Sequence, residues 1–379
     1  MKIVVNALSS RLGGGQTYLR NLFQHLPQRD GLEVVVFASP DLDLPAHRCV
    51  RLAHARWPTS NPLMRTLWER LALPRLLHRE RTDVLFCPGG VVATHVPDGC
   101  KVVTMFRNMI PFDAELMARM PWGLQRLRNL ILARVMLRSM TGADLTIFVS
   151  DHARSVIEAR APVPRAVTIP HGIGEAFRTH GRRLERPVDA PAGEYLLYVS
   201  RFDIYKHHAE VVQAYASLPA KLRDRHPLLL LGEVNLPEAA RVARLVDELG
   251  MQRHVYMPGA IPYRDLPAYY QHAKAIVFAS SCENCPNILL EALASGRPVL
   301  SSDVMPMPEF GGNGLLYFSP FSPASIAAAL RGVLEDPQLA QRVADAALTR
   351  SKRFDLSHTA AETWQRIFGL VDAGAAGSA

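Results

Sequence analysis

Two glutamates, Glu283 and Glu291, lie on either side of a short loop between an apolar run and a helical pattern. The run AIVFASS is typical of a buried strand, and NILLEALAS of a short helix that ends at Gly296. Asn287 suits the N-cap of that helix, so the amides that follow and the helix dipole would attract an anion. Glu291 could then accept hydrogen bonds from vicinal hydroxyls, and Glu283 from another hydroxylated group. A diphosphate flanked by two sugars would fit this corner, unless Glu291 only stabilises the helix and Glu283 is solvated.

Two cations, Arg201 and Lys206, follow the run YLLYVS, which also has the pattern of a buried strand. Because the carboxyl ends of parallel strands meet at one edge of a sheet, both cations would lie at the same edge as the anion site. His207 and His208 come next and suit the start of a helix, although either could touch a phosphate.

Two series of alternating strand and helix patterns must position these residues. In the first half, runs such as KIVVNAL, LEVVVFAS and DVLFCPG alternate with amphipathic segments, which predicts a parallel sheet in a first domain at 1–178. The polar, proline-containing segment 179–193 predicts a linker. A second series covers 194–355, and 356–379 predict a C-terminal helix that crosses back to the first domain, followed by a tail. We therefore expect an α/β protein with two Rossmann-like domains facing each other across a deep cleft.

A glycine-rich segment, RLGGGQTYLRNL, follows the first strand and opens a helix. Gly13 and Gly15 fit a dinucleotide fingerprint, but Tyr18 stands where a third glycine would allow close helix packing. Asp41, at the end of the second strand, could still bind a ribose, so an NAD site stays open. The other interpretation is a strand-to-helix turn that simply needs glycine.

Together these patterns resemble the retaining GT-B glycosyltransferases of family 4, the glycosyltransferase group 1 type, over nearly the whole chain. Members pair an Arg and a Lys after a strand with two Glu separated by seven residues, followed by a small residue, Gly, any residue, Pro and Val. The matching residues here are Arg201, Lys206, Glu283, Glu291 and 295–299. The segments PHGIGEAF, VYMPGAIPYRDLPAYYQHAKAIVFAS and WQRIF are also similar to family segments.

The resemblance implies a role for most of these residues. Arg201, Lys206 and Glu283 would be the catalytic residues. Arg201 and Lys206 would bind the diphosphate and Glu283 the donor sugar, while Glu291 would hold the nucleotide ribose. The other donor-binding residues would be Gly14, Gly15, Gly259, Ala260, Ile261, Pro286, Asn287, Ile288 and Leu289. It further implies a hexosyltransferase that uses a nucleotide diphosphate sugar without a metal or other cofactor, because the cations neutralise the leaving diphosphate.

The segment MFRNMIPFD departs from the family. Many members have His-Asp at this strand end, where this chain has Arg107 and Asn108 before Pro111. A role for that histidine is therefore not carried over, but a retaining transfer in which a donor phosphate oxygen takes the acceptor proton needs no such base. Arg107 or Asn108 could orient the sugar or the acceptor. His171 could approach the cleft or be a packed turn residue.

Two further patterns suggest metal or redox chemistry. Cys282 and Cys285 form a CxxC, but no second CxxC or spaced histidine pair completes a zinc site, so we expect small loop thiols. Asp41 and Asp43 imitate the metal-binding DxD of GT-A glycosyltransferases, which would not supply a second α/β series. We expect no metal site.

The net charge and the positions of the arginines indicate which class of partner the protein binds. The formal net charge of +8 favours anionic partners. The segment MPWGLQRLRNLILARVMLRSM places Arg126, Arg128, Arg134 and Arg138 among apolar residues, which suits an anionic leaflet, although an amphipathic core helix fits as well. Nucleic acid would require base-stacking aromatics, and only Trp122 is near, so no nucleic acid is expected.

Composition indicates a soluble globular protein of a reducing compartment. Hydrophobic residues make up 48 % and the five cysteines are irregularly spaced. No apolar run approaches the roughly eighteen residues of a membrane span, and 1–6 begin a strand pattern at once. We expect a cytoplasmic protein, peripheral on the inner face of the cell membrane if the basic helix docks there.

The predicted function is transfer of a hexose to a hydroxyl of a saccharide or lipid-linked saccharide in bacterial surface polysaccharide or lipopolysaccharide synthesis. Two alternatives remain. One is a nucleotide-sugar epimerase or hydrolase of the same fold. The other is a catalytically silent protein that binds a nucleotide sugar or a glycan, which the missing histidine makes conceivable.

Overall fold

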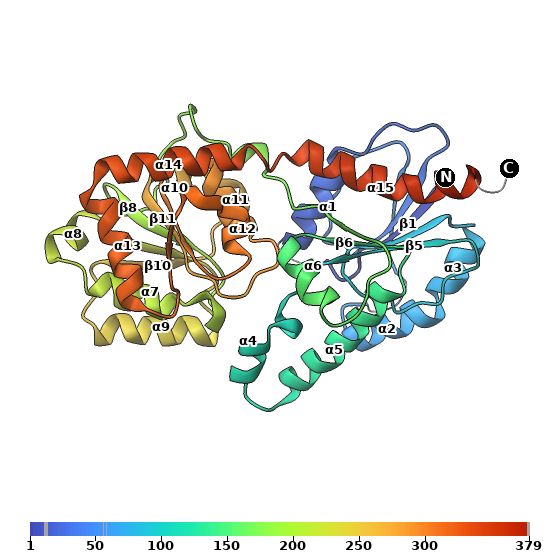
Figure 1. The fold of residues 1–379 in the computed structure, drawn as a ribbon, viewed down its shortest axis with the longest axis horizontal. Coiled ribbons are helices and arrows are strands. Elements are labelled where there is room, and N and C mark those ends of the chain that lie inside the picture. The colour runs from blue at the N-terminus through green and yellow to red at the C-terminus, as the bar shows by residue number, and fades with distance from the viewer. Residues whose placement is uncertain (11–13, 56, 58, 377–379) are drawn as a thin grey trace. The chain divides into compact units, whose positions relative to one another are not determined.

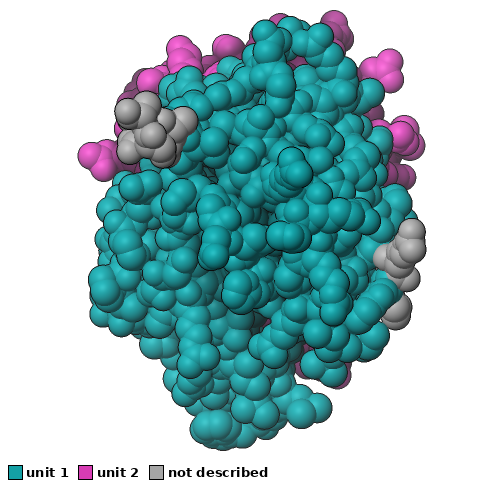
Figure 2. Space-filling view, turned by 90° about the vertical axis from the view of Figure 1, so that its right-hand side faces the viewer, with its two compact units in different colours: residues 1–172, 356–379 teal, residues 173–355 magenta. Residues whose placement is uncertain are grey.

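The structure, a computed structural model, describes residues 1–10, 14–55, 57 and 59–376. These residues form two compact units (Figures 1 and 2). Unit 1 comprises 1–172 together with the C-terminal helix from Leu356 onwards, and unit 2 comprises Ile173–Asp355.

Unit 1 is built on a parallel sheet in the order β3-β2-β1-β4-β5-β6-β7. Its strands are β1 (Lys2–Asn6), β2 (Glu33–Phe37), β3 (Val50–Ala53), β4 (Val84–Cys87), β5 (Lys101–Phe106), β6 (Leu145–Phe148) and β7 (Ala166–Thr168). Its helices are α1 (Gly14–Gln24), α2 (Pro62–Leu71), α3 (Leu73–Arg79), α4 (Ala114–Arg119), α5 (Leu124–Thr141), α6 (Asp151–Glu158) and α15 (Leu356–Ala376). Central strands such as VLFC are buried throughout, because helices surround the sheet (Figure 1).

Unit 2 repeats this architecture with the strand order β10-β9-β8-β11-β12-β13, which is the doubly wound Rossmann order. Its strands are β8 (Tyr195–Val199), β9 (Leu228–Leu231), β10 (Val255–Gly259), β11 (Ala273–Phe278), β12 (Val299–Ser302) and β13 (Leu316–Phe318). Its helices are α7 (His208–Ala216), α8 (Ala220–Arg225), α9 (Pro237–Glu248), α10 (Leu266–His272), α11 (Asn287–Ala294), α12 (Met307–Gly311), α13 (Pro323–Glu335) and α14 (Pro337–Ser351). The prediction of two parallel-sheet α/β units is confirmed.

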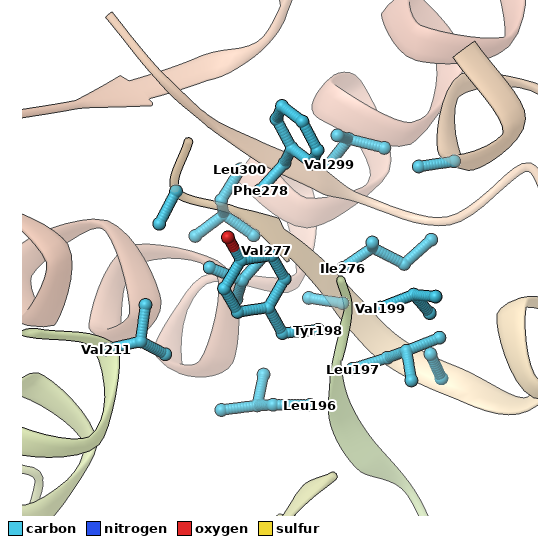
Figure 3. Packing of buried hydrophobic residues seen from close by; sticks show 14 of the residues in the cluster. Leu196, Leu197, Tyr198, Val199, Val211, Ile276, Val277, Phe278, Val299 and Leu300 are labelled. Atoms are coloured by element: carbon cyan, nitrogen blue, oxygen red, sulfur yellow. The ribbon is translucent and has the colours of Figure 1, made fainter. Parts of the chain in front are cut away.

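The core of unit 2 lies on both faces of its central strands. Leu197 and Val277 are completely buried, and Phe278 and Tyr198 contribute two large aromatic side chains (Figure 3). β8 and β11 are neighbours in parallel register, with Leu197 opposite Ile276. This packing fixes the carboxyl ends of the two strands next to each other, although about 80 residues of chain separate them.

The segment 179–193, predicted as a linker, belongs to unit 2. The Thr179 hydroxyl donates to the Ser295 carbonyl over 3.3 Å, and the Leu184 amide donates to Gln271 Oε1 over 2.8 Å. The Gln271 amide nitrogen in turn donates to the Thr179 carbonyl over 2.9 Å. These bonds satisfy backbone groups that proline-rich, polar sequence would otherwise leave to water.

The C-terminal helix α15 belongs to unit 1. Trp364 is fully buried, donates its indole hydrogen to the Leu22 carbonyl of α1 over 2.9 Å, and meets the Phe23 ring edge-on. Arg29 pairs with Asp372 over 2.6 Å. The chain therefore crosses between the units twice, after Gly172 and after Asp355.

Candidate functional site

The catalytic candidates of unit 2 lie at the carboxyl edge of its sheet, where the strand order reverses between β8 and β11. Arg201 and Lys206 follow β8, and Glu283 follows β11. In open α/β sheets this switch point leaves a crevice in which ligands bind. The structure therefore brings together three residues that the sequence predicted to share one edge.

Lys206 and Glu283 form an ion pair that is largely shielded from water. The Lys206 side chain is 8 % exposed and that of Glu283 16 %. The Lys206 ammonium also lies 5.2 Å from the centre of the Tyr205 ring and 5.5 Å from that of Phe278. A cation that is desolvated in this way interacts strongly with any anion that reaches it, because little water screens the charge.

The turn that carries Lys206 is held by local hydrogen bonds. Asp203 Oδ1 accepts from the Ile204 amide over 2.8 Å and so caps the 3₁₀ turn Ile204–Lys206. The Tyr198 hydroxyl donates to the Lys206 carbonyl over 2.6 Å, and the Tyr205 carbonyl accepts from the Ser281 amide over 2.8 Å. The β8 and β11 loops are thus tied to each other directly.

His207 and His208 have different roles at the start of α7. His207 adopts a left-handed conformation with φ of 53°, and its Nε2 lies 2.8 Å from Ser281 Oγ. His208 is completely buried and stacks with the rings of Tyr198 and Phe202, with centroids 4.6 and 4.2 Å away. Burial, and then the nearby Lys206 charge, lower the pKa of His208 to about 3. His208 is therefore a neutral core residue, and His207 connects the two loops.

Arg201 is the exposed cation of this edge. Its side chain is 63 % exposed, and its Nε lies 3.9 Å from Glu233 Oε2, a carboxylate that follows β9. An ion pair this long and this exposed contributes little stability. Arg201 is therefore free to move toward a ligand.

Glu291 is buried on α11 and is held by two tyrosines. The Tyr263 hydroxyl donates to Glu291 Oε1 over 2.8 Å, and the Tyr270 hydroxyl donates to Oε2 over 3.5 Å. Burial raises the pKa of Glu291 to about 8, although both hydroxyls act to lower it. Tyr263 is 47 % exposed as a residue, while its hydroxyl donates to the carboxyl group. Glu291 is thus a carboxyl group that changes charge near neutral pH beside a surface tyrosine.

The start of α11 differs from the prediction. Asn287 was expected at the N-cap, but the helix begins with Asn287 and Pro286 takes the cap position without a side-chain cap. The Asn287 amide donates to the Cys285 carbonyl over 3.0 Å. Leu289 is fully buried and Ile288 half-buried, so the Leu289 side chain packs in the core. The helix still directs its positive end to the carboxyl edge of the sheet.

The segment Gly259 to Ile261 lies at the same edge, where β10 ends at Gly259. Gly259 has a φ of 106°, which is strained for any side chain, and its carbonyl accepts from the Gly232 amide over 3.1 Å. A Cβ on Gly232 would lie 2.0 Å from the Ser200 carbonyl oxygen. Two glycines therefore allow the ends of β8, β9 and β10 to approach closely. Ala260, between Gly259 and Ile261, is exposed.

The predicted residues of unit 1 gather at the carboxyl edge of its own sheet. Gly14 and Gly15 open α1, and Gly13 lies outside the described residues. Asn108 Oδ1 lies 3.3 Å from the Ile110 amide, which donates to it. His171 is buried, 7 % exposed. Arg107 reaches α1, as described below.

The basic helix α5 exposes apolar as well as charged side chains. Leu124 is 88 % and Leu127 54 % exposed, and Trp122, two residues before the helix begins, is 80 % exposed. The exposed arginines Arg128, Arg134 and Arg138, together with Arg126, form no ion pair with a carboxylate in the part of the chain that the structure describes. The Arg126 guanidinium instead lies 3.9 Å from the centre of the Trp122 ring. Within 1–10, 14–55, 57 and 59–376, no helix is both long and apolar enough to cross a membrane.

Several residues at the unit 2 edge were not identified from the sequence. They are Tyr263, Tyr270, Glu233 and Ser281. The two tyrosines stand in PYRDLPAYYQHA, but nothing in their spacing indicates a partner 21 and 28 residues later. Cys282 and Cys285 are not joined in a disulfide, and the first is buried and the second half-buried.

Comparisons with known proteins agree with this architecture. Residues 185–350 match the model of glycosyl transferases group 1, and residues 12–177 match that of glycosyltransferase family 4. The serotype-specific mannosyltransferase WbdA of Escherichia coli is 29 % identical over 227 residues, 58 % of this chain and 28 % of WbdA. The O-antigen chain mannosyltransferase B of Escherichia coli is 28 % identical, over 59 % of this chain and 60 % of the relative. The chain thus spans less than two thirds of either relative.

One solved structure extends the likeness to nearly the whole fold. Anabaena HepE in complex with UDP-glucose superimposes with a TM-score of 0.72 at 16 % identity, covering 97 % of this chain and 100 % of HepE. At this identity the likeness concerns the fold alone.

Proposed function

The chain belongs to the family 4 glycosyltransferases of the group 1 type, with a GT-B fold, and we propose that it transfers a hexose from a nucleotide diphosphate sugar to a hydroxyl group with retention at the anomeric carbon. The observation that carries this proposal is the shielded Lys206–Glu283 ion pair at the switch point of unit 2, together with the buried Glu291 on α11, the helix that follows the Glu283 loop. One cation and two carboxylates are what a diphosphate between two sugars requires.

The proposed roles follow from burial and position. Lys206 and Arg201 bind the diphosphate together with the start of α11, where Asn287, Ile288 and Leu289 carry backbone amide hydrogens and Pro286 does not. Glu291 accepts from the ribose hydroxyls once they displace the Tyr263 hydroxyl, and Glu283 accepts from hydroxyls of the hexose. In unit 2, the proposed contacts of the base are Gly259, Ala260 and Ile261. In unit 1, the proposed phosphate-binding residues are Gly14 and Gly15, and the proposed acceptor-orienting residues are Arg107, Asn108 and His171.

In the proposed transfer, the bond between the anomeric carbon and the diphosphate oxygen breaks while the acceptor oxygen bonds to that carbon on the same face. The acceptor proton passes to the departing phosphate oxygen, so no protein base is consumed. Negative charge on the diphosphate grows in the transition state, and Lys206 and Arg201 stabilise it. These two positive charges support the proposal that no metal and no further cofactor is required.

The relatives support the choice of substrates. Two are named as mannosyltransferases, one of them for an O-antigen chain, and HepE was solved with UDP-glucose. We therefore propose a saccharide or lipid-linked saccharide acceptor in the synthesis of bacterial surface polysaccharide or lipopolysaccharide.

Contact with an anionic membrane is proposed for the surface formed by Trp122, Leu124, Leu127 and the four arginines of α5. Exposed apolar side chains next to unpaired cations suit the boundary between lipid headgroups and acyl chains. The exposure of Trp122 and Leu124 supports this over the core-helix alternative. The proposed location is the cytoplasm and the inner face of the cell membrane.

The function is tested with a panel of nucleotide diphosphate sugars, scored for release of nucleotide diphosphate with and without membrane extract as acceptor. Acceptor-dependent release is expected for one donor. Release or isomerisation without acceptor would favour the epimerase or hydrolase alternative. Nucleotide binding without turnover under any acceptor would favour the silent binding protein.

A further inference from the structure

Arg107 connects two segments of unit 1 that are 93 residues apart in sequence. It follows β5, and its Nη2 donates to the carbonyl of Gly14, the first residue of α1, over 2.8 Å. Its guanidinium carbon lies 5.1 Å from the centre of the Tyr18 ring, one turn further along α1. The side chain therefore contacts the start of α1 at two positions that are one turn apart.

The same tyrosine contacts the end of unit 1. The Tyr18 and His171 rings lie 5.2 Å apart with an angle of 31° between them, and both residues are 7 % exposed. His171 immediately precedes Gly172, the last residue before the chain leaves unit 1. The half-buried Arg107 and the buried Tyr18 and His171 thus link β5, α1 and the first crossing point.

Electrostatics alone do not explain this arrangement. A cation beside the N-terminus of a helix opposes the helix dipole, so Arg107 does not stabilise α1 through its charge. What it does supply is geometry, because a planar guanidinium can donate to a carbonyl and lie over an aromatic ring at once. A hydrogen bond at the first carbonyl and a ring contact one turn later restrict how the start of α1 can shift.

We propose that Arg107 is a positioning residue that holds the first turn of α1, and with it Gly14 and Gly15, in the geometry that the transfer reaction uses. Its contacts are with the protein, and its effect on the reaction passes through Gly14 and Tyr18. This inference rests on the proposed function, in which Gly14 and Gly15 lie against the donor. It assigns a role to the arginine that stands where many family members have histidine.

The test compares Arg107→Ala and Arg107→Lys with Arg48→Ala, which removes an exposed arginine of the same unit. Hydrogen exchange of amides in 14–24 should accelerate at least fivefold in Arg107→Ala and stay unchanged in Arg48→Ala. Turnover number should fall at least tenfold in Arg107→Ala while the KM for acceptor changes less than twofold. Arg107→Lys keeps a cationic donor but loses the planar guanidinium that contacts Gly14 and Tyr18 at once, and should recover only part of both losses.

Two results would overturn the inference. Unchanged exchange in α1 together with a raised acceptor KM would make Arg107 an acceptor-binding residue. Unchanged hydrogen exchange and unchanged kinetics would show that Arg107 neither holds α1 nor contributes to the reaction. If the wild-type protein shows no turnover with any donor, the proposed function fails, but hydrogen exchange still decides whether Arg107 holds α1.

Discussion

Replacing Glu291 with Gln should change how the stability of the protein depends on pH. Burial raises the pKa of this carboxyl from 4.5 to about 8 in the folded protein. In the unfolded chain the carboxyl ionises near pH 4.5, so raising the pH above that value favours unfolding. The associated stability is fully present below pH 4.5 and is lost as the pH rises through 8.

The size of the effect follows from the two pKa values. At about 1.36 kcal/mol for each pH unit between them, Glu291 should make the protein about 3 kcal/mol less stable at pH 8 than at pH 5. Glutamine stays neutral and keeps one oxygen acceptor for Tyr263, as the protonated carboxyl does. The variant should therefore lack this part of the pH dependence. All other titrating groups are shared by the two proteins and cancel in the difference.

The measurement is urea unfolding of both proteins, followed by circular dichroism at pH 5, 6, 7 and 8. Glu335→Gln, which changes an exposed glutamate of the same unit, is the matched control and should parallel the wild type. The difference between wild type and Glu291→Gln should widen in favour of the variant as pH rises. A constant difference across this range would show that Glu291 is ionised throughout, and the reasoning from burial would be wrong.

Three further outcomes follow from the structure. Lys206→Ala should lower the turnover number about 100-fold or more but the affinity for nucleotide diphosphate far less, because charge on the leaving group grows in the transition state. Equal losses in turnover and affinity would contradict this, as would a similar loss in the exposed-residue control Lys221→Ala. Gly232→Ala should destabilise the protein by about 1–3 kcal/mol in thermal unfolding, because the new Cβ would meet the Ser200 carbonyl. The control Gly174→Ala should be neutral, because a Cβ there has open space and Gly174 has a φ of -66° that any residue can adopt. Changing Arg126, Arg128, Arg134 and Arg138 to Gln should abolish flotation with acidic liposomes, since each basic side chain contributes about 1 kcal/mol to binding. The double change Trp122→Ser and Leu124→Ser should weaken flotation at any salt concentration. If neither set of changes alters flotation, α5 is an ordinary helix without a membrane role.

The sequence predicted the sheets and the edge that carries the chemistry. Alternating strand and helix patterns require parallel sheets, and parallel strands place their carboxyl ends together, which brings Arg201, Lys206 and Glu283 to one edge without knowledge of their contacts. The same reasoning recognised the helix that begins near Asn287. It misplaced the cap by one position, because capping preferences describe residue types and the structure places Pro286 at the boundary.

Tertiary contacts were beyond the reach of the sequence. The two tyrosines of Glu291 come from α10 and the turn before it, and their hydroxyls reach the carboxyl only after α10 and α11 have packed. The segment 179–193 has the composition of a linker, yet Gln271 provides partners for its backbone. Hydrogen bonds between residues nearly ninety positions apart leave no local pattern.

The ion pair at the switch point connects the fold to the proposed chemistry. Lys206 and Glu283 come from strands that are adjacent only because the Rossmann order reverses there, and the tie between Tyr205 and Ser281 holds their loops together. Removing one partner would leave a shielded charge uncompensated, which costs more than the pair contributes. A ligand that offers a diphosphate to Lys206 and sugar hydroxyls to Glu283 can separate the pair and still satisfy both charges. A bare phosphate satisfies only the cation, and a neutral sugar only the carboxylate. The pair would therefore favour a ligand that joins both groups, as the proposed nucleotide diphosphate sugar does.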